Sequence, residues 1–121
     1  MRITDLLDAR SVSLTSSPKT KSEALDQAVA LMTKSGKIND EEAYRSQVYA
    51  REEESTTGIG EGIAIPHARS EAVNAPGLAA MVVKDGVDYQ SLDNQPAKLF
   101  FMIAVPKTGG NEHLQILAML S

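Results

Sequence analysis

The spacing of apolar and polar side chains predicts a strand followed by a helix in the first part of the chain. Val12 and Leu14 alternate with polar residues, which indicates a short, half-buried strand over residues 11–17. Residues 18–37 then carry apolar side chains three and four positions apart, as on one face of an amphipathic helix. The side chains on that face are Leu25, Ala28, Val29 and Met32.

Capping residues mark where the first helix begins and predict a second helix after it. Thr20 is expected to cap the first helix, with Glu23 three residues later as in a capping box. A second helix is predicted over residues 39–55, and either Asn39 or Asp40 is expected to cap it. Tyr44, Val48 and Arg51 are predicted to lie on related faces of this second helix.

The second half of the chain predicts strands and one further helix. Glycines precede a short apolar run that ends at Pro66, which indicates a turn followed by a short strand. Residues 78–83 are expected to form another strand, with a turn at Asp85 and Gly86. Residues 97–106 are almost continuously apolar, which favours a central strand covered on both faces. The last segment predicts a helix capped by Asn111, with Ile116, Leu117 and Leu120 on its apolar face.

These elements predict an α/β fold. Their order is strand, helix, helix, strand, strand, strand, helix, which favours a mixed β-sheet flanked by helices in a three-layer sandwich. The 121 residues correspond to a single domain over residues 1–121. Because the helical pattern is still running at Ser121, we expect a domain truncated at its C-terminus or cut from a longer chain.

The composition narrows the classes of function. The net charge is −4 and no cluster of Lys or Arg stands out, which argues against nucleic acid as a partner. The chain has no cysteine, so disulfides, thiol catalysis and cysteine-based zinc sites are excluded. No segment is long and apolar enough to span a bilayer, and acidic residues near the start argue against a signal peptide. We therefore expect a cytoplasmic protein without direct membrane insertion.

His67 is the first candidate for chemistry. Pro66 has a fixed φ and favours an extended conformation at Ile65, so the short strand delivers His67 to an edge or end of the sheet with little freedom. An imidazole held there could act as a general base, as a metal ligand or as a nucleophile toward phosphorus. The alternative is a packed histidine bonded to a backbone carbonyl.

Other candidates are less specific when each is taken alone. Gly58, Gly60 and Gly62 could cradle a phosphate, but they match no known phosphate-binding loop and fit an ordinary tight turn as well. His113 in the first turn of the last helix could donate to a phosphoryl oxygen, or it could be a surface histidine. Arg51 suits phosphate recognition or a solvated helix end.

Two further groups of charged residues predict no site. The run Glu52, Glu53 and Glu54 is expected to be a solvated face. No spacing of histidines and carboxylates resembles a known metal motif, so a metal site is not expected.

Two motifs resemble a known family. "GIGEGIAIPHA", residues 58–68, and "GGNEHLQILAMLS", residues 109–121, are similar to the enzyme IIA domain of the fructose–mannitol class of the bacterial phosphoenolpyruvate-dependent sugar phosphotransferase system. The likeness extends over nearly the whole chain, including "ITDLLD", "KSEALDQAVALM" and "YAREEESTTGIG". The first motif resembles the fructose branch more than the mannitol or nitrogen-regulatory branches. Domains of this family continue past the last helix, which implies that the family's last elements are missing here.

The resemblance implies roles for the candidate residues. His67 corresponds to the phosphorylated histidine, and His113 to the histidine that lies beside it. Arg51 corresponds to the arginine that helps to hold the phosphoryl group. Backbone groups at Gly60, Glu61 and Gly62 are then expected to stabilise the phosphoryl oxygens.

The resemblance also implies a relay between proteins. His67 would take a phosphoryl group from the histidine-containing phosphocarrier protein and pass it to a cysteine of a IIB domain, on the same or a membrane-bound chain, for uptake of fructose. No metal or other cofactor is expected, because the donor is already a high-energy phosphohistidine. One alternative is a regulatory module of the nitrogen-type or transcription-factor-associated branch that binds protein partners. Another is a histidine-dependent phosphatase or a metal-binding domain.

Overall fold

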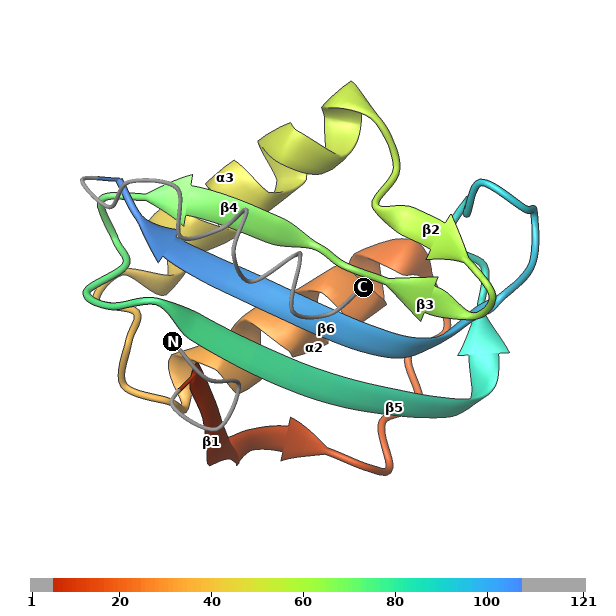
Figure 1. Cartoon of the computed structure of the whole chain (residues 1–121), viewed down its shortest axis with the longest axis horizontal. Coiled ribbons are helices and arrows are strands. Elements are labelled where there is room, and N and C mark those ends of the chain that lie inside the picture. Colours follow the sequence, from red (N-terminus) through yellow and green to blue (C-terminus); the bar gives the residue numbers. More distant parts are fainter. Residues whose placement is uncertain (1–5, 108–121) are drawn as a thin grey trace.

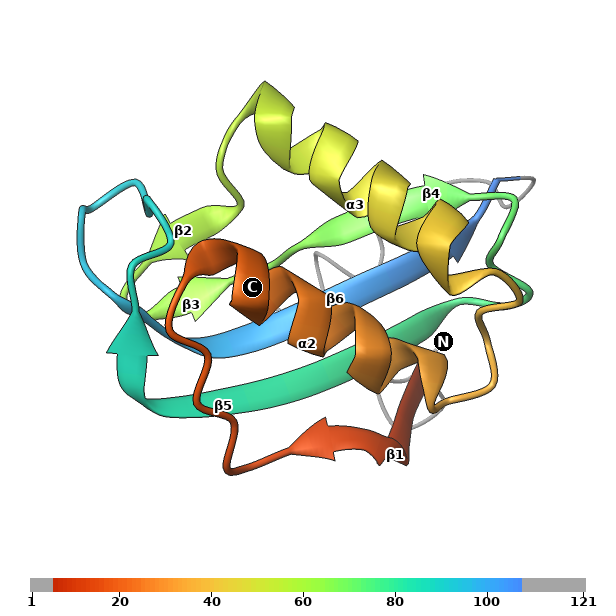
Figure 2. The same cartoon turned by 180° about the vertical axis from the view of Figure 1, so that it is seen from behind.

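The computed structural model describes residues 6–107, which form a mixed β-sheet and two helices (Figure 1). The helices are α2, Lys21–Thr33, and α3, Glu41–Glu54. The strands are β1, Leu7–Ser13; β2, Gly58–Gly60; β3, Ile63–Ala64; β4, His67–Ser70; β5, Gly77–Val87; and β6, Ala97–Pro106. Both helices lie on the same face of the sheet, as Figure 2 shows from behind. The predicted mixed sheet with helices is thus confirmed.

Strand β6 is the centre of the sheet, as its continuous apolar run predicts. The strand order is β1-β5-β6-β3-β2, and β4 also pairs with β6. The pairing of β5 with β6 is antiparallel, whereas β3 and β4 both run parallel to β6. Strand β1 is parallel to β5, and β2 forms a short antiparallel hairpin with β3.

Two groups of buried side chains occupy the two faces of the sheet. The larger group joins α2 and α3 to the sheet and includes Leu25, Met32, Tyr44, Met81 and Phe100, all nearly inaccessible to solvent. The smaller group consists of Leu6, Ile65, Leu78, Ile103 and Val105. A three-layer sandwich also needs a helix on the second face; the remaining predicted helix, with its cap at Asn111, lies outside the described residues.

Both helices begin at predicted capping residues. The Thr20 side chain accepts from the backbone N–H of Glu23 at 3.1 Å, and Asp40, rather than Asn39, accepts from the N–H of Ala43 at 3.1 Å. Glu23 completes a variant of the capping box, because its carboxylate accepts from the N–H of Lys19 at 2.6 Å instead of from that of Thr20.

The structure corrects three predictions about strands. The first strand is β1, Leu7–Ser13, rather than residues 11–17, and Leu14 lies beyond its end and is 70% exposed. Strand β5 does not turn at Asp85 and Gly86 but continues to Val87, which pairs with Ala97. The register of β5 against β6 shifts between Val82 and Val87, and Gly86 has φ +77°. The glycine therefore allows a β-bulge or similar irregularity within the strand, and it does not form a turn. The single strand predicted before His67 is divided into β2 and β3, with a turn between them, and His67 itself begins β4.

Candidate functional site

His67 lies at an interruption of the strand that runs beside β6. Strand β3 pairs with β6 as far as Phe100, and β4 resumes the pairing with His67 opposite Ile103. Pro66 lies in the interruption, where its missing N–H costs no ladder bond, and its carbonyl accepts from the N–H of Ile103 at 3.0 Å. Among the described strands β4 pairs only with β6, so His67 is on an edge strand, as predicted.

The hydrogen bond of the imidazole fixes its tautomer. Nδ1 of His67 is 2.9 Å from the backbone oxygen of Ile65. A carbonyl oxygen can only accept, so Nδ1 carries the proton in this bond, and in the neutral ring Nε2 therefore has the lone pair. The ring is half-buried. His67 thus has the hydrogen bond to a backbone carbonyl that was the alternative prediction, and it is also accessible enough to react.

A cavity of about 310 Å³ between α3 and β4 brings His67 and Arg51 together. Its lining consists of Gln47, Ala50, Arg51, Glu54, His67, Ala68 and Arg69. Arg51 is in the last turn of α3, where Nη1 donates to the backbone oxygen of Ser55 at 3.0 Å. That bond uses one of the five N–H donors of a guanidinium.

Tyr44 fixes helix α3 relative to His67. Its side chain is fully buried, and its hydroxyl donates to the backbone oxygen of Ile103 at 2.9 Å. Ile103 is the residue that pairs with His67 across the sheet. Burial raises the pKa of the Tyr44 hydroxyl far above its usual range, so it stays a neutral donor. Helix α3, which carries Arg51, is therefore hydrogen-bonded to β6 at the residue that pairs with His67.

The predicted residues Gly60, Glu61 and Gly62 form the turn between β2 and β3. Their φ angles are +102°, +58° and +79°, all in the left-handed region, which explains two glycines in three positions. The N–H of Glu61 donates to Asp93 at 2.9 Å, and none of the three residues lines the cavity beside His67. His113, the remaining predicted residue, lies outside the described residues.

The structure corrects the prediction that Glu52 is solvated. Its carboxylate is buried and accepts three hydrogen bonds, from the N–H and hydroxyl of Thr57 at 2.8 and 2.6 Å and from the hydroxyl of Tyr89 at 3.0 Å. The Lys21 Nζ lies 3.0 Å from Oε2 of Glu52 and also lies over the ring of Tyr89. Tyr44, Val48 and Glu52 are the buried residues of α3, and their spacing of four is the signal that could have identified Glu52.

The pKa of Glu52 is lowered. Burial alone would raise it, but the bonds from Thr57 and the ammonium of Lys21 outweigh the burial. The carboxylate is therefore ionised at neutral pH and joins the C-terminal end of α3 to the segment that leads into β2.

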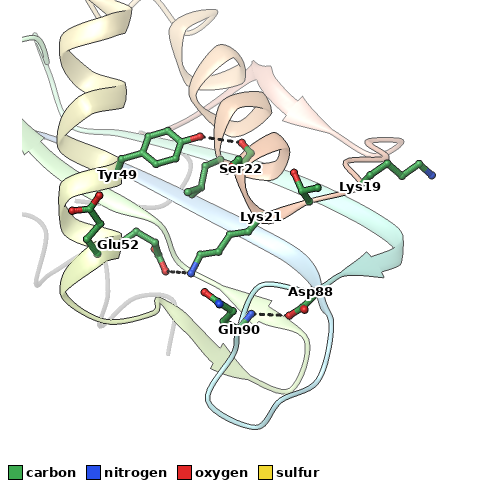
Figure 3. A pocket seen from close by; sticks show the side chains of 10 residues that line it. Lys19, Lys21, Ser22, Tyr49, Glu52, Asp88 and Gln90 are labelled. Atoms are coloured by element: carbon green, nitrogen blue, oxygen red, sulfur yellow. Dashed lines mark hydrogen bonds and ion pairs between the residues drawn. The ribbon is translucent and has the colours of Figure 1, made fainter.

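A larger cavity, of about 650 Å³, lies between the start of α2 and the end of α3 (Figure 3). Its polar groups are largely paired with one another. Lys21 pairs with Glu52, the hydroxyl of Tyr49 donates to the backbone oxygen of Ser22 at 3.2 Å, and the N–H of Gln90 donates to Asp88 at 3.0 Å. Lys21 and Glu52 of the buried network line this cavity, and His67 does not.

Within residues 6–107 there is no group of three or more metal-ligating side chains that could hold an ion. The helices of this part of the chain are too short and too polar to cross a membrane.

Comparison with known proteins places the chain in a family. The family model described as "Phosphoenolpyruvate-dependent sugar phosphotransferase system, EIIA 2" matches residues 5–121. The chain is 48% identical, over its whole length, to the fructose-specific EIIABC component of Bacillus subtilis, of which it spans 19%. It is also 44% identical over 110 residues to the fructose-specific EIIA component of Haloferax volcanii. This match covers 91% of the chain and 71% of that protein.

Solved structures agree with this placement. The nitrogen regulatory protein IIA-Ntr of Neisseria meningitidis matches with a TM-score of 0.83 and 27% identity, over 98% of this chain and 80% of that one. The IIA domain in the complex of mannitol IIA with phosphorylated IIB from Escherichia coli matches with a TM-score of 0.80 and 28% identity, over 95% and 80%. The mixed sheet, the matched residues and these relatives agree, and the chain belongs to the EIIA 2 family of phosphotransferase components of the phosphoenolpyruvate-dependent sugar phosphotransferase system.

Proposed function

We propose that His67 receives a phosphoryl group from the histidine-containing phosphocarrier protein and passes it to a cysteine of a IIB domain, in the uptake of fructose. The observation that carries this proposal is the imidazole of His67, whose Nδ1–H is bonded to the backbone oxygen of Ile65, which leaves Nε2 as the nucleophile; His67 and Arg51 line the same cavity. Relatives named as fructose-specific components support the choice of sugar.

The transfer requires one bond to form and one to break. The lone pair of Nε2 attacks the phosphorus of the donor phosphohistidine, and the electron pair of the breaking P–N bond returns to the donor's imidazole. His67 keeps its Nδ1 proton, and the positive charge that develops on its ring is stabilised by the carbonyl of Ile65. In the second transfer the thiolate of the acceptor attacks the same phosphorus and His67 leaves as the neutral ring.

Arg51 and His113 have parts in this scheme that follow from their chemistry. The guanidinium of Arg51 donates to the equatorial oxygens of the transferring group, where negative charge must be compensated. The resemblance assigns His113 to the same task, whereas Gly60, Glu61 and Gly62 do not line the cavity beside His67 and take no part in this scheme. We therefore propose a site in which the ring nitrogen supplies the nucleophile and its neighbours supply the donors.

Phosphorylation by the carrier tests the proposal. The chain and its His67→Ala variant are incubated with phosphoenolpyruvate, enzyme I and the phosphocarrier, and intact mass reports bound phosphoryl groups. We expect one acid-labile group on the unaltered chain and none on His67→Ala. Equal uptake by the two proteins would overturn the assignment of His67.

A regulatory role is the second candidate, supported by relatives named as nitrogen regulatory proteins, including one from Pseudomonas aeruginosa that is 33% identical over 101 residues. The acceptor separates the two roles. A transport component passes its phosphoryl group to a fructose IIB domain within the time of the assay, whereas a regulatory module keeps it or loses it only by hydrolysis.

A further inference from the structure

Residues 55–57, which follow α3, hold the side chain of Arg51. The backbone oxygen of Ser55 accepts from Nη1 of Arg51 at 3.0 Å, and the Ser55 hydroxyl oxygen lies 3.5 Å from the same nitrogen. Ser55 is the C-cap of α3 and has an extended backbone, with φ −172° and ψ 153°. The direction of its carbonyl therefore depends on how residues 55–57 are held, and not on the helix alone.

The same residues also hold the ring of His67, through the backbone of Ile65. The backbone oxygen of Thr57 accepts from the N–H of Ile65 at 3.0 Å. The backbone oxygen of Ile65 is in turn the acceptor for Nδ1 of His67 at 2.9 Å. Only one residue lies between these two bonds, and Pro66 restricts its conformation. Thr57 therefore helps to set the direction of the carbonyl that orients the imidazole.

The carboxylate of Glu52 anchors residues 55–57 to α3. Its Oε2 accepts from the N–H of Thr57 at 2.8 Å, and its Oε1 accepts from the hydroxyl of Thr57 at 2.6 Å. Tyr89 and Lys21 hold the carboxylate from the other sides, as Figure 3 shows for Lys21. Because both oxygens bind one residue, Thr57 cannot shift without losing a charge-assisted hydrogen bond.

We infer that Glu52 is a positioning residue for phosphoryl transfer by His67. This inference rests on the proposed function of His67. Glu52 acts through residues 55–57, which orient the guanidinium of Arg51 at one end and the ring of His67 at the other. An in-line transfer depends on how the nucleophile is placed relative to the donors for the equatorial oxygens, and a displacement of about 1 Å can slow such a reaction about a hundredfold.

Two substitutions of Glu52 separate its role as an acceptor from its charge. Glu52→Met keeps nearly the same length but has no oxygen for Thr57, whereas the amide oxygen of Glu52→Gln can still accept from the N–H of Thr57. Phosphorylation by the phosphocarrier is followed by rapid quenching and intact mass at several carrier concentrations. We expect Glu52→Met to lose about tenfold in kcat with an unchanged KM, because Glu52 is buried and cannot contact the carrier, and Glu52→Gln to stay within about threefold.

Nitrogen NMR of the His67 ring measures its orientation without any phosphoryl transfer. At a pH where the ring is neutral, Nδ1 of the unaltered chain should give the signal of a protonated nitrogen and Nε2 that of an unprotonated one. In Glu52→Met the two signals should move toward each other, because the second tautomer becomes populated when the carbonyl of Ile65 is displaced. In Glu52→Gln they should stay apart. A role in stability alone would leave the signals unchanged in both variants.

Val29→Ala is the control for lost stability. Val29 is fully buried on α2, so its truncation destabilises the core at a position that makes none of the bonds described above. It should transfer at the rate of the unaltered chain. Thermal unfolding of every variant shows whether the fold is retained.

Thr57→Val is the milder variant, in case Glu52→Met does not fold. It removes the hydroxyl bond to Glu52 and keeps the backbone bond, so we expect a loss of about threefold in kcat. Thr57→Ser keeps the hydroxyl and should restore the rate.

The outcomes separate this inference from the proposed function. The inference is overturned if Glu52→Met transfers within about twofold of the unaltered chain, if Val29→Ala is slowed as much as Glu52→Met, or, where Glu52→Met does not fold, if Thr57→Val and Thr57→Ser have equal kcat. In these cases the assignment of His67 stands, provided that His67→Ala takes up no phosphoryl group. If His67→Ala takes up phosphate as well as the unaltered chain, the proposed function fails and this inference fails with it.

Discussion

Replacing Glu52 with glutamine removes one charge from the buried network that ties α3 to the segment before β2. The carboxylate has a residue exposure of 8%, and it accepts from the N–H and hydroxyl of Thr57 and from the hydroxyl of Tyr89. The two hydroxyls are themselves 3.0 Å apart. Glutamine has nearly the same shape, so the substitution changes the electrostatics and leaves the packing in place.

The magnitude follows from which bonds survive. In the Glu52→Gln variant the amide oxygen, placed as Oε2 of Glu52 is now, can still accept from the N–H of Thr57. The amide nitrogen then faces the hydroxyls of Thr57 and Tyr89, which must turn away from their present acceptor. Lys21, which lies 3.0 Å from the same Oε2, keeps an oxygen acceptor but loses the opposite charge. We expect the free energy of unfolding to fall by about 2 kcal/mol at pH 7, within the range for charge-assisted hydrogen bonds that are lost in a buried site.

The effect of pH has a definite sign. Because the pKa of Glu52 is lower in the folded protein than its ordinary value of 4.5, its carboxylate stabilises the fold above that pH. The stabilisation is lost as the pH falls below 4.5 and through the folded pKa. The substituted glutamine does not titrate, so the stability difference between the two proteins should be full at pH 7 and should shrink below pH 4.5.

Urea unfolding, followed by circular dichroism at a series of pH values, measures this difference. Glu53→Gln is the control, because Glu53 is the exposed neighbour on the same helix, and its substitution should change the unfolding free energy by less than about 0.5 kcal/mol. A Glu52→Gln variant that matches this control at pH 7, or a difference that does not depend on pH, would refute the role given to the buried carboxylate.

Two further changes test how the turn before β3 is held. Gly58→Ala should destabilise the fold by about 1–3 kcal/mol in urea unfolding, because its Cβ would meet Ser91 Oγ and lie 2.9 Å from both Ser91 Cα and the ring of Tyr89; an unchanged midpoint would contradict this close approach. Asp93→Ala should speed hydrogen exchange at the N–H of Glu61, because this N–H donates to the Asp93 carboxylate at 2.9 Å. Because that bond and one from Gln95 lower the pKa of Asp93, acidification through this pKa should also weaken the protection of the Glu61 N–H in the unaltered chain, measured as its exchange rate relative to the intrinsic rate at the same pH. Equal protection in the variant would count against the contact.

The local pattern of the sequence was sufficient for the helices and for the central strand. Apolar spacing predicted α2 and α3, and the apolar run predicted the central β6. Capping chemistry located the start of α2 at Thr20 and that of α3 at Asn39 or Asp40, of which the structure has Asp40. These features depend on residues within a few positions of one another. The same is true of Pro66, which restrains the backbone on either side of it and so places His67 on an edge strand.

The buried network was decided by the tertiary structure. Glu52 reads as one of three consecutive acidic residues, and its most distant bonding partner, Tyr89, is 37 positions away in the sequence. A carboxylate is buried only where donors from other parts of the chain come together around it. The local sequence pattern does not show which distant residues will do so. Gly86 is a similar case, since only the pairing of Val87 with Ala97 keeps β5 in the sheet where a turn was predicted.

The sequence by itself determined that a histidine is held behind a proline and which family motif surrounds it. Only the tertiary structure decided what lies around that histidine. The bond from Nδ1 to Ile65 fixes which nitrogen keeps its lone pair, and the packing of α3 against β4 puts Arg51 and Arg69 into one cavity with His67. The physical reason is that a reactive site depends on distances between side chains, which are set when separate helices and strands pack together.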